Sequence, residues 1–455
     1  MFFKNKNGNI RINQIMISAC IYLGQALIGY TTTWSGPIIP KLRDLNQSPL
    51  PYLPSEMEIS LIATFLYVGC IPAPYIMGWL SNFKGRKPCL VIGGTISIIA
   101  YGLLATANNL AMLYSGRILG GFGLGIVAVM NLVYIGEIAS TSIRGILLTI
   151  VGISMTCGSI LLFTVGGFLS YHASTYFGLS LSIAFTLGTL MLPESPIFYV
   201  LKDDEQALDK VLQVLGRSDE KKKMFEARNE FKSHNTRIDV IELFTVKANK
   251  RALFVVIIIN VLQQCSGVMV VVFFSASIFE MAGSSIRSDV GMIVIGCFQL
   301  LGSTIAPFFV ERLGRKTLLI ISTIICSVSM FGLGLYFYLD YIGEPGINNV
   351  KWLPFVILIL FFIGYDSGIG IIPNVLIGEM FTCNTRSIGS TIAMSTAWLA
   401  GFLVTTVFST MLESLGAYGV FWFYSSTCAC ALLFTIFFIP ETKSKSLLEI
   451  QKLMN

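Results

Sequence analysis

Charged side chains are scarce in this sequence, and histidine is nearly absent. Lys, Arg, Asp and Glu make up 12% of the 455 residues, against about 25% in an average soluble protein. The two histidines, His172 and His234, have no nucleophile or metal-ligand spacing around them, so we expect no enzyme, no cofactor and no metal site. The chain also lacks a basic domain with interleaved aromatic residues, which argues against a nucleic-acid partner.

Apolar side chains make up 54% of the chain, and its mean hydropathy is +0.74. Apolar runs of about 20 residues, long enough to cross a hydrocarbon core of roughly 30 Å, recur along the whole sequence. They predict twelve transmembrane helices in a lipid bilayer, at residues 14–38, 59–80, 89–107, 111–136, 145–168, 172–192, 252–279, 289–309, 317–339, 352–377, 387–411 and 418–439. The first run exceeds the apolar core of a signal peptide and no A-x-A-like site follows it, so we expect it to be retained.

Basic residues are distributed unevenly between the two sides of the predicted bundle. Lys and Arg are retained preferentially on the cytoplasmic side of short loops. With a cytosolic N-terminus, the cytosolic segments hold most of the 31 basic residues, whereas the outer loops hold only Lys41, Arg43, Arg287 and Lys351. This bias predicts a multi-pass protein of the plasma membrane with both termini in the cytosol.

Two residue types support this topology. Asn46 begins the sequon Asn46-Gln47-Ser48 in the first outer loop and is a candidate for N-glycosylation, although Pro49 disfavours its use. All ten cysteines except Cys383 fall inside predicted spans, and no CxxC pair stands in a soluble segment. We interpret the cysteines as packing residues.

Three short signatures occur twice, in the same order and at similar offsets, each at a predicted cytosolic helix end. They are Gly85-Arg86-Lys87 and Gly314-Arg315-Lys316, Glu137 with Arg144 and Glu379 with Arg386, and Pro193-Glu194-Ser195 and Pro440-Glu441-Thr442. Transporters are often built from duplicated helical bundles, with the substrate near the bilayer midplane between them. We predict an all-α membrane protein with two pseudo-symmetric six-helix bundles at 14–192 and 252–439. A cytosolic linker with short helices at 193–251 joins them, and cytosolic tails lie at 1–13 and 440–455.

The repeated charges predict a cytosolic gate that fastens the two bundles while the outer side is open. Exposed ion pairs contribute about 0–1 kcal/mol each, so a network of several is weak enough to break in every transport cycle. The alternative is ordinary retention of positive charge on the cytosolic side. The predicted gate residues are Arg86, Lys87, Glu137, Arg144, Glu194, Glu311, Arg315, Lys316, Glu379, Arg386 and Glu441.

Longer motifs cover nearly the whole chain. They are Gly116-Arg117-Ile118-Leu119-Gly120-Gly121, Tyr134-Ile135-Gly136-Glu137, Arg144-Gly145, Pro193-Glu194-Ser195-Pro196, Gln263-Gln264-Cys265-Ser266-Gly267 and Pro440-Glu441-Thr442-Lys443. They resemble the sugar porter family of the major facilitator superfamily. The run from Thr396 to Phe402 and the short ending from Ser446 to Leu453 resemble the insect facilitated trehalose transporters in particular. The resemblance implies the twelve-helix fold of that superfamily and facilitated passage of a hexose or disaccharide.

The resemblance also implies that Gln263 and Gln264 bind sugar hydroxyls. An amide side chain supplies both a donor and an acceptor, as a sugar requires. Amides buried in a membrane helix are costly without partners, so these two residues beside Asn260 indicate a water-filled cavity, or else hydrogen bonds to neighbouring helices. Asn374, Trp398 and Trp422 complete the predicted substrate-binding set, although the tryptophans also suit packing or interface anchoring.

Several positions depart from the family pattern, mostly where polar side chains are common. They are Gly152, Met269, Phe273, Phe274, Ala397 and Gly401. Each lost amide removes a hydrogen bond of about 0.5–1.5 kcal/mol, so binding of a standard hexose should weaken. A different small polar or glycosylated solute and a non-transporting sugar receptor therefore remain as alternatives. Asn82 and Ile197 replace charged residues of the family, which predicts a weaker gate on the N-terminal half.

Few charges enter the predicted spans. Proton-coupled relatives often carry Asp where Thr31 stands, so we expect a uniporter, working as a monomeric transport unit. Arg117 and Asp366 are the predicted intramembrane charges. Asp366 lies among Gly364, Gly368 and Gly370, where we expect a helix to bend. It suits a gating or structural ion pair, with proton coupling as the alternative.

Overall fold

The computed structural model describes residues 10–140, 143–221, 224, 236–283, 287–381, 383–443, 445 and 449. This part of the chain is helical throughout and contains no strand. Eleven of its helical segments are long and apolar enough to cross a membrane. The last of them is 51 residues long and contains two of the twelve predicted spans.

The first six spans are built from eight helices. The first span is α1 (Ile10–Thr33) continued by α2 (Ser35–Leu42), and the second is α3 (Glu56–Cys70) continued by α4 (Ala73–Lys84). The other four are α5 (Arg86–Ala105), α6 (Leu110–Ile138), α7 (Arg144–Phe168) and α8 (Tyr171–Met191). Side-chain caps at Ser55, Asn109 and Ser170 accept backbone N–H groups that would otherwise be unpaired where α3, α6 and α8 begin.

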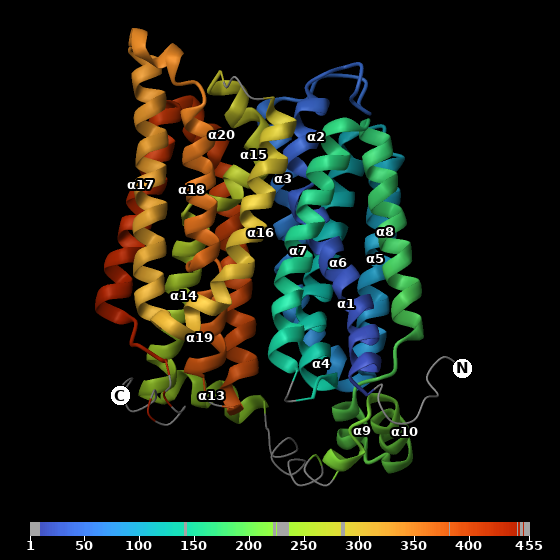
Figure 1. The fold of residues 1–455 in the computed structure, drawn as a ribbon. Helices are drawn as coiled ribbons and strands as arrows, with labels where there is room; N and C mark the ends of the chain where they lie inside the picture. The colour runs from blue at the N-terminus through green and yellow to red at the C-terminus, as the bar shows by residue number, and fades with distance from the viewer. Residues whose placement is uncertain are drawn as a thin grey trace.

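The remaining spans follow a group of short helices. The short ones are α9 (Pro196–Lys202), α10 (Glu205–Leu215), η1 (Ser218–Glu220) and α13 (Thr236–Thr245). The long ones are α14 (Lys247–Cys265), α15 (Val268–Met281), α16 (Ser288–Leu313), α17 (Arg315–Tyr341), α18 (Leu353–Ser367), α19 (Ile372–Met380) and α20 (Cys383–Phe438), with η2 (Pro345–Asn349) between α17 and α18. The short helices lie at the same end of the bundle, the linker face, with α9 and α10 beneath the first half and α13 beneath the second; the opposite end is the far face (Figure 1).

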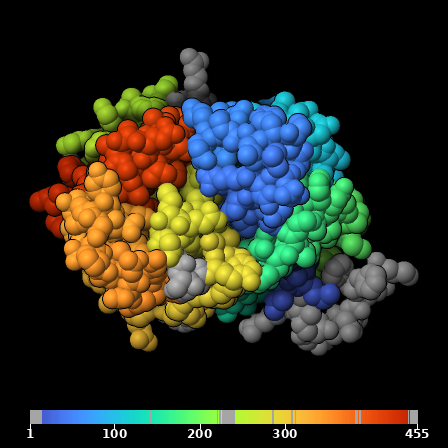
Figure 2. Space-filling model, turned by 90° about the horizontal axis from the view of Figure 1, so that it is seen from above, coloured from blue at the N-terminus to red at the C-terminus, as the bar shows by residue number. Residues whose placement is uncertain are grey.

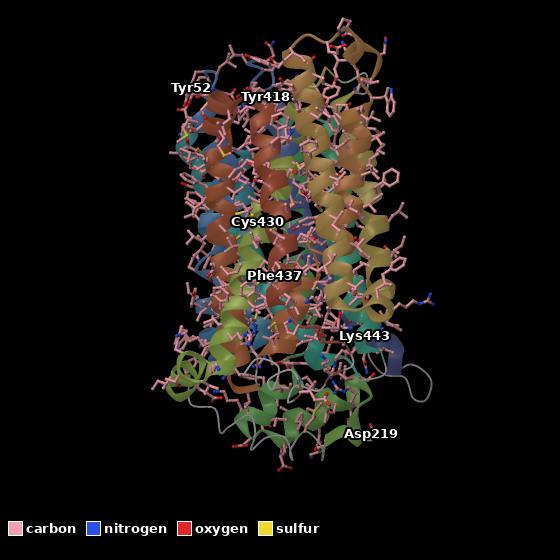
Figure 3. All side chains as sticks on the ribbon, turned by 90° about the vertical axis from the view of Figure 1, so that its left-hand side faces the viewer. Tyr52, Asp219, Tyr418, Cys430, Phe437 and Lys443 are labelled. Atoms are coloured by element: carbon pink, nitrogen blue, oxygen red, sulfur yellow. The ribbon has the colours of Figure 1, made fainter. Side chains whose placement is uncertain are left out.

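Helix α20 reverses direction in its middle. Its 56 residues would reach about 80 Å if straight, far more than a bilayer. Gly416 has a φ of +69°, a conformation open to glycine, and it turns the chain there. Figure 3 shows Tyr418 near the far face, Cys430 and Phe437 progressively lower, and Lys443 at the linker face. The two arms of α20 are therefore the eleventh and twelfth predicted spans.

Two other breaks interrupt spans near the middle of the molecule. Gly267 separates α14 from α15 with a φ of +83°, and a Cβ there would lie 2.6 Å from the Tyr424 ring. The segment from Gly368 to Ile371 separates α18 from α19, so the bend expected beside Asp366 is confirmed.

The helices form two groups that pack side by side, as Figure 2 shows from above the far face. Within the groups, α1 packs on α7 and α14 on α20, while α5 packs on α6 and α17 on α18. Between the groups, α3 contacts α20, α7 contacts α16 and α2 contacts α15. The predicted pair of pseudo-symmetric six-helix bundles is confirmed.

Candidate functional site between the two halves

A network of charges at the linker face ties together the ends of α5 and α6 in the first half. Arg86 opens α5 and pairs through Nη2 with Glu137 Oε1 at 2.9 Å. Glu194 accepts the backbone N–H groups of Arg86 at 2.9 Å and Lys87 at 3.2 Å. The Ser195 hydroxyl donates to the second oxygen of Glu137. A carboxylate thus lies at the positive end of the α5 dipole.

The second half contains the same network at equivalent positions. Arg315 opens α17 and pairs through Nη2 with Glu379 Oε1 at 3.0 Å. Glu441 accepts the backbone N–H groups of Arg315 at 3.0 Å and Lys316 at 3.1 Å. The Thr442 hydroxyl donates to Glu379 Oε2 at 2.6 Å. The three repeated sequence signatures therefore converge on one motif in each half.

The backbone around Glu441 determines the charge of this carboxylate. Partial burial raises its pKa, but the N–H groups of Lys443, Arg315 and Lys316 bind the ionised form and lower the pKa overall. Above the ordinary pKa of glutamate the Glu441 carboxylate is fully charged, and the stabilisation it provides is lost only as the pH falls through the lowered value. It is therefore ionised at every physiological pH.

These networks join helices of the same half. Arg144 likewise donates to Ala139 O at 3.3 Å, within its own half. The side chains of Asn82, Glu311 and Arg386 lie outside the described residues. In this conformation the charges stabilise each half separately, and their expected link between the halves stays a prediction for the other conformation.

Bonds at the far face do join the two halves. Arg43 pairs with Glu56 at 2.6 Å and donates from Nη1 to Ser277 Oγ on α15 at 2.8 Å. The hydroxyls of Ser60 on α3 and Ser409 on α20 also bond to each other. The sequence analysis did not predict this contact and named Arg43 only as one of the few basic residues in the outer loops.

Arg117, on α6, is buried with no carboxylate beside it among the residues described. It donates to Ile62 O at 3.0 Å, Ala63 O at 3.2 Å and Thr31 O at 3.2 Å, and its guanidinium lies 5.1 Å from the Trp34 ring centroid. The fork of N–H groups thus holds α3 and the α1–α2 junction against α6. Its place inside the span is as predicted, and its contacts are structural.

Asp366 lies at the end of α18, just before the break. A Cβ at Gly302 would lie 3.1 Å from Asp366 Cβ, so the aspartate faces α16. Its Oδ2 is buried and has no hydrogen-bond partner within the described ranges. The expected ion pair therefore stays a prediction.

The glutamine pair lies at the centre of the second half. Gln263 donates through Nε2 to Ile369 O at 2.8 Å and Gly370 O at 3.0 Å, carbonyls freed by the break between α18 and α19. Gln264 is 8% exposed, and its Oε1 has no partner in the described part of the chain. Asn260 donates to Val256 O of its own helix at 2.8 Å. Gln263 is therefore engaged with a neighbouring helix, while Gln264 keeps a free acceptor.

The other predicted binding residues are dispersed. Trp398 reaches across to the first half, because its Cζ3 would lie 3.3 Å from a Cβ at Gly125. Asn374 is exposed on α19. Trp422 packs with α17 in an aromatic cluster whose ring centroids lie 6.2 Å away for Phe331 and 5.5 Å for Tyr338. The structure thus places Trp422 in a packing environment, which was the alternative for this residue.

Tyr67 is the central residue that sequence reasoning missed. It comes from α3, is 5% exposed, and its ring centroid lies 5.8 Å from that of Phe273 on α15. A Cβ at Gly401 would lie 2.9 Å from Tyr67 Cζ and 3.2 Å from Gln264 Oε1. From the sequence, a tyrosine in an apolar span is interpreted as a packing residue. Only its proximity to Gln264 in the structure makes Tyr67 a candidate site residue.

Two cavities open at the far face between the halves. The larger, about 580 Å³, is lined by Lys41, Asp44, Glu280, Arg287 and Asp289 among others. The smaller, about 260 Å³, lies beside the Arg43 contact. No group of three His, Cys, Asp or Glu side chains comes together as a metal site in the described ranges.

Comparison with known proteins relates this chain to a family of transporters. A family model described as "Sugar (and other) transporter" matches residues 17–454. The chain is 29% identical to a facilitated trehalose transporter of Polypedilum vanderplanki, covering 97% of this chain and 88% of that protein. It is 28% identical to one of Aedes aegypti, covering 97% of this chain and 55% of that protein.

A solved structure of the proton:xylose symporter XylE shares the fold. The two superpose with a TM-score of 0.77 at 21% identity, covering 98% of this chain and 100% of the other. At that identity the likeness concerns the fold alone, which is that of the major facilitator superfamily. With the family match over nearly its whole length, the chain belongs to the sugar transporter family.

Proposed function

We propose that this chain carries a sugar, trehalose or a hexose, down its gradient by alternating access. The family and the relatives named as facilitated trehalose transporters support a sugar as cargo. The observation that carries the proposal is the buried pair Gln263 and Gln264: Gln263 bonds to the α18–α19 break, and Gln264 lies near Tyr67 of the other half. Amides and freed carbonyls at this depth suit a neutral ligand rich in hydroxyls.

The bonds between the halves assign a state to this conformation. Arg43 with Ser277, and Ser60 with Ser409, hold the far face together, whereas the linker-face pairs Arg86–Glu137 and Arg315–Glu379 each lie within one half. We infer that this is the inward-facing state, with the linker face in the cytosol. Outward opening must then break the far-face bonds, which are few enough to break reversibly.

Uniport is supported by the first span. Thr31 occupies the position where proton-coupled relatives often carry Asp, and its hydroxyl bonds to Tyr101 Oη at 3.0 Å and Leu27 O at 2.8 Å. Proton coupling is the second candidate, because Asp366 Oδ2 is buried without a partner in the described part. The two differ in whether uptake responds to external pH.

The remaining assignments follow from this orientation. The chain resides in the plasma membrane with both termini in the cytosol. Asn46 is exposed at the far face, where a glycan can be attached. Each chain contains both halves of the pathway, so we propose that one monomer is the transport unit.

Radiolabelled uptake in oocytes tests the proposal. We expect saturable, pH-independent uptake of trehalose or glucose that is lost in Gln263→Ala, because that amide holds α14 at the α18–α19 break. Gln299→Ala on α16 is the matched control and should retain uptake. If the wild type is at the surface and none of trehalose, glucose or a polyol enters, sugar transport is wrong. Uptake that rises at acid pH would replace uniport by proton coupling.

A further inference from the structure

Two buried polar atoms near the centre of the molecule lack partners. They are Tyr67 Oη and Gln264 Oε1, on side chains that are 5% and 8% exposed. Neither has a hydrogen-bond partner in the described ranges. The great majority of buried polar groups in native proteins are paired, so each unpaired one requires an explanation. A bound ligand would supply it.

The two atoms flank one point in space. A Cβ at Gly401 would lie 2.9 Å from Tyr67 Cζ and 3.2 Å from Gln264 Oε1, so the tyrosine ring and the amide oxygen pack closely against the same glycine. Tyr67 comes from α3 in the first half, and Gln264 from α14 in the second. Phe273 of α15 forms an aromatic wall beside the tyrosine. The two unpaired polar groups thus come from different halves and meet at Gly401.

Donor and acceptor types at this point are complementary to one chemical group. The phenol O–H can donate, and the amide oxygen can accept. A ligand hydroxyl does both at once, accepting from Tyr67 and donating to Gln264. An ether, a hydrogen or a fluorine in its place would leave the amide oxygen unpaired.

We propose that Tyr67 and Gln264 form a hydroxyl-binding subsite, across the two halves, that determines which sugars the chain accepts. This inference rests on the proposed sugar transport and adds a selectivity residue to it. The sequence shows glycine at 401, where the family resemblance implies an amide. The tyrosine of the opposing helix supplies a polar group at the same place. Gln263 is already engaged with Ile369 and Gly370, which leaves Gln264 for the ligand.

The test measures uptake kinetics and competition by a panel of monodeoxy and monodeoxyfluoro analogues of the sugar that the wild type carries. One analogue should compete about three- to tenfold less well than the parent, as expected for loss of a neutral hydrogen bond. In Tyr67→Phe the parent's KM should rise by a similar factor while that analogue is unaffected, so the discrimination narrows to what the bond to Gln264 alone provides. Tyr114→Phe on α6 should keep the wild-type pattern.

A second variant tests the same subsite in case Tyr67→Phe does not fold. Gly401→Ala places a methyl group between the phenol and the amide and should abolish the same discrimination, whereas Gly78→Ala, whose Cβ would meet nothing within 4 Å, should not. If Tyr67→Phe reaches the surface and retains the wild-type selectivity over the whole panel, the subsite is wrong although sugar transport stands. If the wild type carries no sugar at all, the proposed function fails and the subsite fails with it.

Discussion

Glu194 and Glu441 bind to the first turns of α5 and α17. Each carboxylate has room there because the neighbouring residue is a glycine, Gly85 or Gly314. Gly85 and Gly314 have φ values of +99° and +90° with extended ψ, a region essentially restricted to glycine. A Cβ at Gly314 would also lie 2.6 Å from Glu441 Oε2. Glycine is therefore required in the repeated signature for two reasons: its backbone conformation, and the space that the neighbouring carboxylate occupies.

Gly314→Ala should destabilise the second half. The strained backbone costs about 1–3 kcal/mol, and displacement of Glu441 adds to that. We expect a thermal unfolding midpoint several degrees lower in detergent. Gly378→Ala is the matched control. Gly378 precedes Glu379 on α19, and a Cβ there would meet nothing within 4 Å, so the variant should be neutral or stabilising. Equal midpoints for the two variants would contradict this account of the glycine.

Residues differ in how far the sequence reveals their place. Gln263 and Gln264 were predicted from the family resemblance, and amides in an apolar span also suit that role. Trp422 was predicted either as a sugar contact or as a packing residue, and Tyr67 was missed, since both belong to spans that are apolar on every side. Such helices lack the polar face that would reveal their rotation. Only packing shows that Trp422 joins α17 while Tyr67 faces Gln264.

The number of transmembrane spans was predictable from the sequence, but not every break within a span was. Apolar length predicts the arms of α20 as two spans, and the glycines around Asp366 predict the break between α18 and α19. The junction between α1 and α2 at Trp34 is followed by Gly36 and Pro37, although the predicted span 14–38 runs through it. At this junction Arg117 donates a hydrogen bond to the Thr31 carbonyl of α1, a tertiary contact that the local sequence does not predict.

The far-face contact of α15 with the α2–α3 loop should control opening. Arg43→Ala removes the bond to Ser277 between the halves, about 1 kcal/mol, which shifts the ratio of two states about fivefold toward outward-facing. A cysteine introduced at Ser275, which lies against Gly36 of α2, should then react faster with an impermeant thiol reagent applied from outside.

Arg287→Ala is the control for this experiment. Arg287 pairs with Asp289 on its own segment at 2.7 Å and is largely exposed, so its loss should leave the labelling rate unchanged. Equal rates in the Arg43 and Arg287 variants would show that the far face is held by other contacts.

For the whole molecule, duplication explains more than any single motif. The repeated signatures predicted two halves, and the structure shows that each signature set closes one network within its own half. What the sequence could not show is how the halves meet, since those contacts join Arg43 to Ser277 and Ser60 to Ser409 across more than 200 positions. The central site, with residues from both halves, depends on that meeting.

Counterflow in proteoliposomes tests the central claim, that the two halves alternately expose one sugar site, most directly. Vesicles containing the purified chain are loaded with unlabelled trehalose or glucose and diluted into a trace of the labelled sugar. A carrier with one alternating site returns loaded with tracer after each release, so labelled sugar should rise transiently above its equilibrium level inside. Tracer that only equilibrates, or never enters, for both sugars would contradict the account.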